Sequence, residues 1–342
     1  MKIKICLSYK GSDEQFNKMA DDLSKVADVT KCDLDIKSLQ GYDIFIGKKL
    51  TKEALETADN LKAIFAYKTG VDDFPLKDIK ERGIVLVNSH ADSHYIAQYA
   101  VGLAISLAYR ITEFDRKFRN GIWYDSEVPY WRSFFGMKIG LLGYGHIGRD
   151  IHSILKTFDS VEVYTLNRGK DYEDITLADT VEELCEKVDM LILSLPKTEA
   201  TTSIINENIL KLLKGKYIVN VGRGNAIDQE AFFSALGGKR VDELRKKEGK
   251  EDVTLPKDER SNYLAGAAVD TWNSKPEIGN TDFYPFDKET DFTILDNIVL
   301  SPHQAMKVAD GFRYYIEDIT NKVTDYIETG KLSDLVDLDK GY

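Results

Sequence analysis

Residues 138–148 read Lys-Ile-Gly-Leu-Leu-Gly-Tyr-Gly-His-Ile-Gly, and they decide how the second half of this chain folds. The apolar run Lys138–Leu142 predicts a buried strand, and His146–Phe158 has the spacing of an amphipathic helix. A glycine-rich turn that joins a strand to a helix in this way is typical of a unit that binds a dinucleotide.

The three glycines of the turn have separate predicted roles. Gly143 permits a tight turn, Gly145 lets the backbone approach a pyrophosphate, and Gly148 lets the helix pack close to the strand. The helix then begins at His146 and Ile147, where backbone N–H groups and the positive end of the helix dipole face the phosphates. We therefore predict that this turn binds the cofactor.

The residues after the next strand distinguish between the two nicotinamide cofactors. NAD enzymes usually carry Asp or Glu there, which binds the ribose 2′-hydroxyl. In this chain the strand Val161–Leu166 is followed by Asn167 and Arg168, so no carboxylate is expected. An arginine suits a 2′-phosphate, since it is always charged and offers several donors. The sequence therefore predicts NADP(H) in preference to NAD(H).

Length, charge and cysteine content bound the class of protein. The 342 residues are too many for one ordinary core and suit two domains. A formal net charge of -11 argues against nucleic acid or an anionic membrane surface as a partner. Cys6, Cys32 and Cys185 are too widely spaced to predict a disulfide scaffold or a zinc site. No signal-peptide core or long apolar run is present, so a reduced, cytoplasmic protein is expected.

Short apolar runs alternate with segments of helical spacing, a pattern typical of parallel sheets covered by helices. The strands expected in the first hundred residues are Ile3–Ser8, Tyr42–Gly47, Leu61–Tyr67 and Ile84–Asn88, with helices at Asp13–Val26 and Lys52–Ala58. Later strands are expected at Asp189–Leu195, Tyr217–Val221, Gly266–Asp270 and Ile298–Ser301, and single long helices at Tyr95–Phe118 and Met306–Thr329. The highly charged segment 239–260 is expected to be a solvated helical excursion or a mobile loop.

Several motifs, in order along the chain, resemble segments of the D-isomer-specific 2-hydroxyacid dehydrogenase family. They are Val87–Asn88, Ile96–Gln98, the turn Gly143–Gly148, Ile218–Gly224, Gly266–Asp270 and Asn297–His303. The resemblance covers nearly the whole chain. It implies an α/β fold of two doubly wound parallel-sheet domains with a cleft between them. A flavodoxin-like substrate domain would comprise residues 1–99 and 304–342, and a Rossmann NAD(P)-binding domain residues 100–303. Family members are commonly dimers, so a homodimer is expected.

The resemblance also assigns roles to single residues. It implies that Arg223 binds the substrate carboxylate and that His303 is the acid/base of the reaction. Thr69 and Gly70 match a loop whose backbone N–H groups bind the carboxylate, although Lys68 stands where Gly is common. The remaining implied cofactor positions are Pro196, Thr201, Val221, Gly222, Arg223 and, near the nicotinamide carboxamide, Asp270.

One position departs from the family pattern. Family members usually have Glu five residues after Asp270, where it hydrogen-bonds the catalytic histidine, whereas this chain has Lys275. A cation there would lower the pKa of His303. Three interpretations stay open. Lys275 binds a second anionic group of the substrate, it points away while Glu277 takes the role of the carboxylate, or catalysis is weak or lost.

These observations predict an NADP(H)-dependent oxidoreductase acting on a small 2-oxo or 2-hydroxy acid, such as glyoxylate or hydroxypyruvate. A dinucleotide-sensing corepressor-like binding protein is the alternative, favoured by Lys275 and the charged segment and opposed by Arg223 and His303. A formate- or phosphite-type oxidation has little support, because the usual Gln or Glu partner of the histidine is missing. No metal site is predicted, since His90 and His94 lack further ligands nearby.

Overall fold

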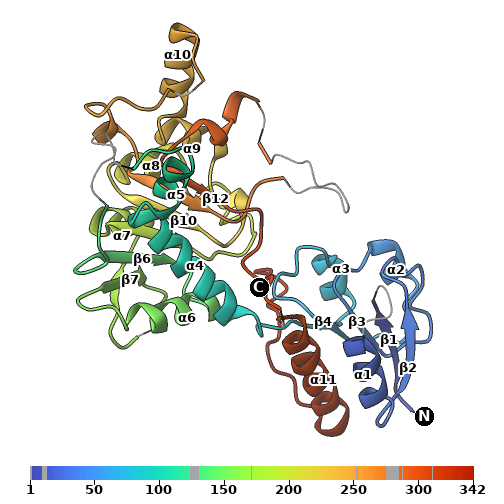
Figure 1. Cartoon of the computed structure of the whole chain (residues 1–342). Coiled ribbons are helices and arrows are strands. Elements are labelled where there is room, and N and C mark those ends of the chain that lie inside the picture. Colours follow the sequence, from blue (N-terminus) through green and yellow to red (C-terminus); the bar gives the residue numbers. More distant parts are fainter. Residues whose placement is uncertain are drawn as a thin grey trace. The chain divides into compact units, whose positions relative to one another are not determined.

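The structure, a computed structural model, describes residues 2–9, 14–123, 131–170, 172–251, 253–274, 285–286, 288–309 and 311–342. The chain forms two compact units, the first comprising Met1–Ser93 and Lys307–Tyr342 and the second comprising His94–Met306. The boundaries expected from the sequence, 99/100 and 303/304, differ from these by a few residues. The N-terminal strands and the C-terminal helix therefore belong to one unit (Figure 1).

The first unit is built on a five-stranded parallel sheet in the order β2-β1-β3-β4-β5. Its strands are β1 (Lys4–Ser8), β2 (Asp28–Cys32), β3 (Ile44–Gly47), β4 (Ala63–Ala66) and β5 (Val85–Val87). Its helices are α1 (Glu14–Leu23), α2 (Lys52–Glu56), α3 (Leu76–Glu81) and α11 (Gly311–Thr329). This strand order is that of flavodoxin-like sheets, so the fold expected for the unit is confirmed.

Strand β2 was not expected from the sequence. It pairs only with β1, so it is an edge strand, and its sequence Asp-Val-Thr-Lys-Cys is largely solvent-exposed. An edge strand of this kind carries no apolar run by which periodicity could identify it. The second unit contains a similar case, the short edge strand β8 (Thr176–Ala178), which was also missed.

The second unit has a seven-stranded parallel sheet in the order β12-β11-β10-β9-β6-β7-β8. Its other strands are β6 (Lys138–Leu142), β7 (Glu162–Leu166), β9 (Met190–Leu193), β10 (Tyr217–Asn220), β11 (Gly266–Val269) and β12 (Ile298–Leu300). Its helices are α4 (Ser93–Ala108), α5 (Ile111–Arg119), α6 (His146–Leu155), α7 (Val181–Lys187), α8 (Glu207–Leu212), α9 (Gln229–Ala235) and α10 (Gly238–Glu248). This is the Rossmann order, which reverses between β6 and β9.

Apolar residues cover both faces of this sheet, which explains why its strands are continuous apolar runs. Leu191 and Leu193 of β9 pack into one core cluster with residues of α7, α8 and α9. Met190 and Ile192 of the same strand pack into the other, with residues of α4 and α6. The alternation of side chains along one strand thus fixes a helical layer on each face.

The expectation of one helix over Tyr95–Phe118 is wrong. Helix α4 ends at Ala108 and α5 begins at Ile111, because Arg110 adopts a left-handed backbone conformation with φ of 57°. The Arg110 guanidinium forms an ion pair with Glu113, and both side chains are at least nine-tenths buried. The left-handed residue and the ion pair mark a break that apolar periodicity alone does not reveal.

The charged segment 239–260 is helical over most of its first half, as part of α10. It is less solvated than expected, because Val241 and Leu244 are buried. Arg240 also donates two hydrogen bonds of 2.8 Å each to the carboxylate of Glu259, which ties the end of the segment to its beginning. Among the described residues, no helix combines the length and apolar character needed to span a bilayer.

Candidate active site

The glycine turn has the close contacts that its sequence predicts. Gly143 has φ of 109°, and its carbonyl accepts a hydrogen bond of 2.9 Å from the Ser194 hydroxyl. A Cβ on Gly148 would lie 2.2 Å from the Gly143 carbonyl oxygen, so only glycine fits where the helix crosses the turn. A Cβ on Gly145 would meet no atom within 4 Å, so the space beside this residue is open.

Helix α6 begins directly at this open space. Gly145 is its N-cap and provides no side chain to hydrogen-bond the first backbone N–H groups, and its first turn carries no acidic residue. His146 and Ile147 are therefore the first residues of a ten-residue helix, and no acidic side chain in its first turn offsets the positive end of the helix dipole. Because β6 and β9 are neighbours at the reversal of strand order, this turn lies where doubly wound sheets bind ligands.

The segment after β7 is polar and exposed, as predicted for Asn167 and Arg168. The structure adds an unpredicted carboxylate nearby, since Asn167 donates a hydrogen bond of 3.1 Å from Nδ2 to Asp179. Asn167 also accepts a hydrogen bond from the Gly169 backbone N–H at 3.0 Å, which turns the chain sharply at Arg168. Asp179 directly follows β8, the edge strand that the sequence did not predict.

The loops after β9 and β10 are tightly built. The Thr201 hydroxyl donates to the Pro196 carbonyl at 2.7 Å, which closes the loop after β9. A Cβ on Gly222 would lie 2.6 Å from the Leu195 nitrogen, so this glycine allows the loop after β10 to approach the loop after β9. Val221, the residue before it, is buried. The five predicted cofactor positions in these loops, with Arg223 as the fifth, therefore lie at the carboxyl ends of two adjacent strands.

Arg223 follows β10 in an extended conformation. Asn220 fixes the backbone on both sides of it, because its side chain accepts from the Gly222 N–H at 3.0 Å and donates to the Arg223 carbonyl at 3.1 Å. The guanidinium itself donates to the Gly222 carbonyl at 3.0 Å. Asn220 is fully buried and was not predicted as a site residue. Its role depends on hydrogen bonds to a loop, which the motif alone does not specify.

Asp270 holds the segment that carries His303. The Asp270 side chain is 1% exposed, and its carboxylate accepts hydrogen bonds from the Ser301 hydroxyl and from the backbone N–H groups of Gln304 (2.8 Å) and Ala305 (3.2 Å). His303 sits inside this bracket with φ of 57°, a left-handed conformation that is uncommon outside glycine. A buried carboxylate thus constrains the backbone on both sides of the predicted acid/base.

Two further side chains secure Ser301. The Tyr99 hydroxyl, from α4, forms a hydrogen bond of 2.8 Å with the Ser301 hydroxyl. The Trp272 indole N–H donates to the Ser301 carbonyl at 3.0 Å. Neither residue was predicted, although each lies within three residues of a quoted motif. The strands β10, β11 and β12 are adjacent, so Arg223, Asp270 and His303 follow three neighbouring strand ends.

In the first unit, the loop that contains Thr69 and Gly70 is joined to the segment after β5. The Thr69 hydroxyl donates to the Ser89 carbonyl at 2.9 Å and to Asp92 Oδ1 at 2.6 Å, and Asn88 donates to the Thr69 carbonyl at 2.7 Å. The Thr69 side chain is therefore engaged within the protein. Lys68, which departs from the family pattern, directs its ammonium group to Asp73.

A buried lysine supports the same segment. Lys322 of α11 donates to the Asn88 carbonyl at 3.0 Å and forms ion pairs with Asp318 (2.6 Å) and Asp334 (2.7 Å). Asp318 in turn accepts a hydrogen bond of 2.6 Å from the Ser89 hydroxyl. The C-terminal helix therefore fixes residues 88–89, on which the Thr69 loop rests.

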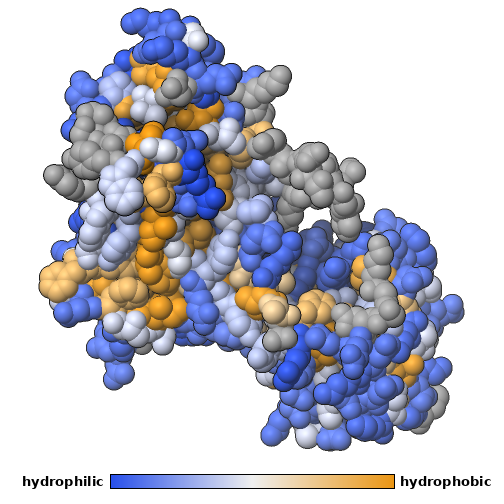
Figure 2. Space-filling view, in the orientation of Figure 1, coloured by the Kyte–Doolittle hydropathy of each residue, from blue (hydrophilic) through white to orange (hydrophobic). Residues whose placement is uncertain are grey.

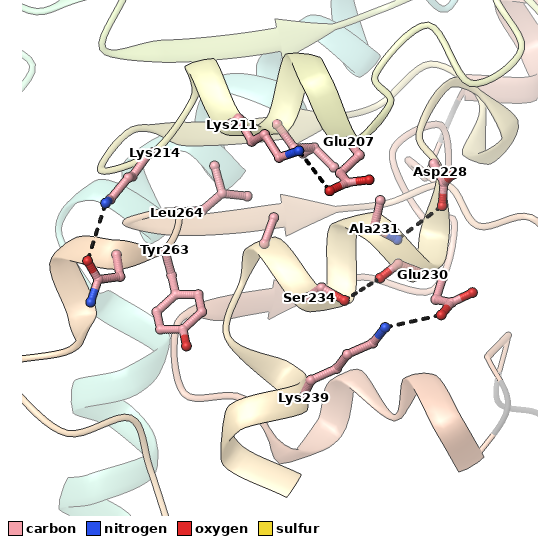
Figure 3. A pocket seen from close by; sticks show the side chains of 13 residues that line it. Glu207, Lys211, Lys214, Asp228, Glu230, Ala231, Ser234, Lys239, Tyr263 and Leu264 are labelled. Atoms are coloured by element: carbon pink, nitrogen blue, oxygen red, sulfur yellow. Dashed lines mark hydrogen bonds and ion pairs between the residues drawn. The ribbon is translucent and has the colours of Figure 1, made fainter. Parts of the chain in front are cut away.

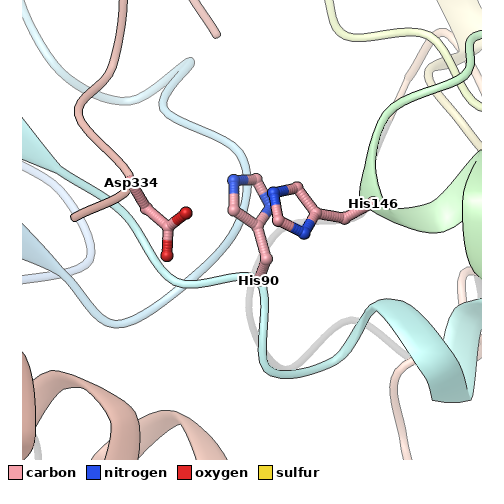
Figure 4. Close-up of side chains that lie close together, drawn as sticks. All are labelled: His90, His146 and Asp334. Carbon is pink, nitrogen blue, oxygen red and sulfur yellow. The ribbon is translucent and has the colours of Figure 1, made fainter.

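The positions of the remaining predicted residues differ in what the structure describes. Lys275 and Glu277 lie outside the described residues. His90 and Asp334, which belong to the first unit, have side-chain ligand atoms within 4.8 Å of each other (Figure 4). His146, drawn in the same figure, begins α6 of the second unit.

A surface pocket of about 720 Å³ lies among α8, α9 and the start of α10 (Figure 3). Its lysines have partners. Lys211 pairs with Glu207 at 2.8 Å, Lys239 with Glu230 at 3.1 Å, and Lys214 donates to Asn262 at 3.2 Å. With Asp228, which also lines the pocket, three carboxylates match the three lysines in charge.

Comparison with known proteins identifies the family. The NAD binding domain of the D-isomer specific 2-hydroxyacid dehydrogenases matches residues 101–244. A glyoxylate reductase of Thermofilum pendens is 32% identical over 269 residues, which cover 75% of this chain and 69% of that protein. A D-3-phosphoglycerate dehydrogenase of Methanocaldococcus jannaschii is 28% identical over 79% of this chain and 47% of its own length. A solved structure from Pyrococcus horikoshii OT3 has a TM-score of 0.75 at 28% identity, covering 98% of this chain and 96% of that chain. The chain therefore belongs to the D-isomer specific 2-hydroxyacid dehydrogenase family of nicotinamide-dependent oxidoreductases.

Proposed function

We propose that this family member reduces small 2-oxo acids with NADPH in preference to NADH. The observation that carries the cofactor preference is the exposed sequence Asn167-Arg168 directly after β7, with a further exposed cation at Lys170. An acidic residue at the strand end would repel a 2′-phosphate, whereas an arginine forms charge-assisted hydrogen bonds with it. The negative charge of Asp179 opposes this preference. One oxygen of its carboxylate is engaged by a hydrogen bond from the Asn167 side chain.

The second unit fits a bound dinucleotide. The open space beside Gly145 and the N-terminus of α6 suit a pyrophosphate, and a side chain at Gly145 would fill that space. When bound, the cofactor supplies the hydride for reduction of the carbonyl carbon. The chain contributes the residues that hold the substrate and deliver the proton.

We assign these tasks to the residues at the three neighbouring strand ends. Arg223 binds the substrate carboxylate and polarises the carbonyl. Asn220 fixes the backbone at Gly222 and Arg223, which positions the guanidinium for this task. His303 gives its proton to the developing alkoxide. Asp270 acts as a positioning residue, because its carboxylate brackets the backbone of His303. The backbone N–H groups of Thr69 and Gly70 are proposed as further donors to the substrate carboxylate.

The proposed substrates are 2-oxo acids of the size of glyoxylate and hydroxypyruvate. The similarity to a glyoxylate reductase supports this class, and that to a D-3-phosphoglycerate dehydrogenase adds acids with a second anionic group. Lys275 remains the candidate ligand for such a group. Assays of Lys275→Glu on mono- and di-anionic 2-oxo acids test this role, and an equal gain on every acid excludes it.

Steady-state kinetics with NADPH and NADH over a panel of 2-oxo acids tests the proposal. We expect kcat/KM to be at least ~10-fold higher with NADPH, a difference of about 1.4 kcal/mol. Arg168→Ala should reduce the preference by raising KM for NADPH alone, while Lys138→Ala, an exposed cation at the amino end of β6, serves as a control. Equal use of both cofactors overturns the cofactor assignment. Tight binding of NADPH without turnover of any acid supports the sensor alternative instead.

We also propose that the protein is a homodimer that associates through α5. Ile111, Phe114 and Phe118 recur at helical spacing on α5, and Ile122 follows the end of the helix; each is more than 40% exposed. Apolar side chains gather over α4 and α5 on the face shown in Figure 2. Charged residues occupy most of the other positions of α5. A contiguous apolar face that is exposed to solvent is unusual for a monomer. Phe118→Glu should convert a dimer to a monomer in sedimentation experiments, whereas Leu335→Glu, at an exposed apolar position of the first unit, should not.

A further inference from the structure

Cys6 and Cys32 lie side by side at the edge of the sheet in the first unit. Cys6 is on β1 and Cys32 ends β2, and the parallel register sets Cys6 opposite Thr30. Cys32 is two residues beyond Thr30, so it projects from the same face of the sheet as Cys6. The two Sγ atoms are 3.1 Å apart, and the Cys6 S–H donates to Cys32 Sγ.

The two thiols have different surroundings. Cys6 is fully buried in the core cluster, whereas Cys32 is partly exposed and packs against the margin of that cluster. The hydrogen bond from Cys6 lowers the pKa of Cys32, and a hydrogen bond with Tyr42 acts in the same direction, whereas burial and Asp33 raise it. The pKa of Cys6 is raised by the same hydrogen bond and by burial. Cys32 is therefore the accessible nucleophile of the pair and Cys6 the buried thiol beside it.

We propose that Cys6 and Cys32 form a reversible oxidation site for hydroperoxides, in which Cys32 reacts first and Cys6 then closes a disulfide. In the first step the Cys32 thiolate attacks the peroxide, the O–O bond breaks, and Cys32 becomes a sulfenic acid while the peroxide leaves as water or an alcohol. In the second step Cys6 attacks the Cys32 sulfur and water leaves. Two thiols are oxidised by two electrons, and the peroxide is reduced by two electrons.

The position of Cys32 favours closure of this bond. The sulfur atoms must approach by about 1 Å to reach the ~2.05 Å of a disulfide. Because Cys32 lies two residues beyond the residue opposite Cys6, the disulfide would run diagonally between the strands, and the backbone near Cys32 must shift slightly. Cys32 is the last residue of an edge strand that has only β1 as a neighbour, so its movement disrupts no second strand pair.

Cys185 is a matched internal control. It is fully buried on α7, and burial raises the pKa of its thiol to about 12. A thiol in such a setting is neither accessible nor ionised near neutral pH. Peroxide should therefore oxidise Cys32 at least ~10-fold faster than Cys185, because thiolate fraction and exposure both differ.

The full chain, freed of reductant, is treated with a few equivalents of hydrogen peroxide and digested for mass spectrometry without reduction. We expect a Cys6–Cys32 cross-linked peptide that dithiothreitol removes, with Cys185 unchanged. In Cys6→Ser, the Cys32 sulfenic acid should persist and be trapped by dimedone. In Cys32→Ser, Cys6 should stay reduced. A circular dichroism spectrum of each variant verifies that it folds.

Two results overturn the proposal. One is oxidation of Cys185 as fast as that of Cys32, which shows general rather than local reactivity. The other is overoxidation of Cys32 in the unaltered chain without any cross-link to Cys6. A cross-link that forms in unaltered protein and in Cys185→Ser at the same rate supports it.

Discussion

Two glycines of the cofactor turn separate the stability of the fold from the binding of the dinucleotide. Gly148→Ala places a Cβ 2.2 Å from the Gly143 carbonyl oxygen, so helix α6 must move away by about 1 Å. Overpacking of this kind costs about 1–3 kcal/mol, and contact with a backbone atom puts the cost at the upper end. The higher helix propensity of alanine returns about 1 kcal/mol. We expect a net loss of about 2 kcal/mol in the free energy of unfolding.

Gly145→Ala should have the opposite pattern. Its Cβ meets no atom within 4 Å and its φ of -81° suits alanine, so the loss of stability without cofactor should stay below about 1 kcal/mol. The new methyl group would occupy the space proposed for the pyrophosphate. The affinity for NADPH should therefore fall by at least ~10-fold, or about 1.4 kcal/mol.

Urea unfolding without cofactor and fluorescence titration with NADPH measure the two effects. Gly102→Ala provides a control, because Gly102 is exposed on α4 and its Cβ would also meet nothing within 4 Å. That variant should gain up to about 1 kcal/mol of stability and bind NADPH unchanged. A Gly148→Ala variant as stable as the unaltered protein, or a Gly145→Ala variant with unaltered affinity for NADPH, would contradict these expectations.

Three further predictions concern buried polar groups. Lys322→Met should lower stability by about 3 kcal/mol in urea unfolding, since two carboxylates lose their cation; an unchanged midpoint would contradict this. Asp270→Asn should reduce kcat at least ~10-fold, because one acceptor of the His303 bracket becomes a donor. Equal kcat would exclude the positioning role, and a changed pH profile of kcat would support it. Burial lowers the pKa of His152 below 6.5. Because the unfolded chain then binds a proton more readily than the folded one, the contribution of His152 to the free energy of unfolding is complete above pH 6.5 and is lost as pH falls through the lowered pKa. The stability difference between His152→Gln and the unaltered protein should shrink from pH 7.5 to pH 5, and a constant difference would refute this.

The sequence predicts those parts of the fold that rest on local chemistry. The inner strands β6, β9, β10 and β11 of the second sheet are largely apolar because both faces are covered, and each was expected from its apolar run. The turn at Gly143 was expected because its glycines are needed by backbone contacts that any such turn makes. Strands β2 and β8 were missed because edge strands need no apolar pattern, and only their neighbour defines them.

The same distinction applies to the candidate site. Arg223 and His303 stand in motifs that follow β10 and β12, so the Rossmann strand order places them on either side of the end of β11. What holds them could not be predicted, because it consists of hydrogen bonds between segments far apart in the chain. Tyr99 reaches Ser301 across 202 positions and Asp270 reaches Gln304 across 34. These contacts exist only once α4, β11 and β12 have packed together. They constrain His303 in a left-handed conformation that its local sequence does not favour, so the geometry of the acid/base is a property of the folded unit rather than of the motif.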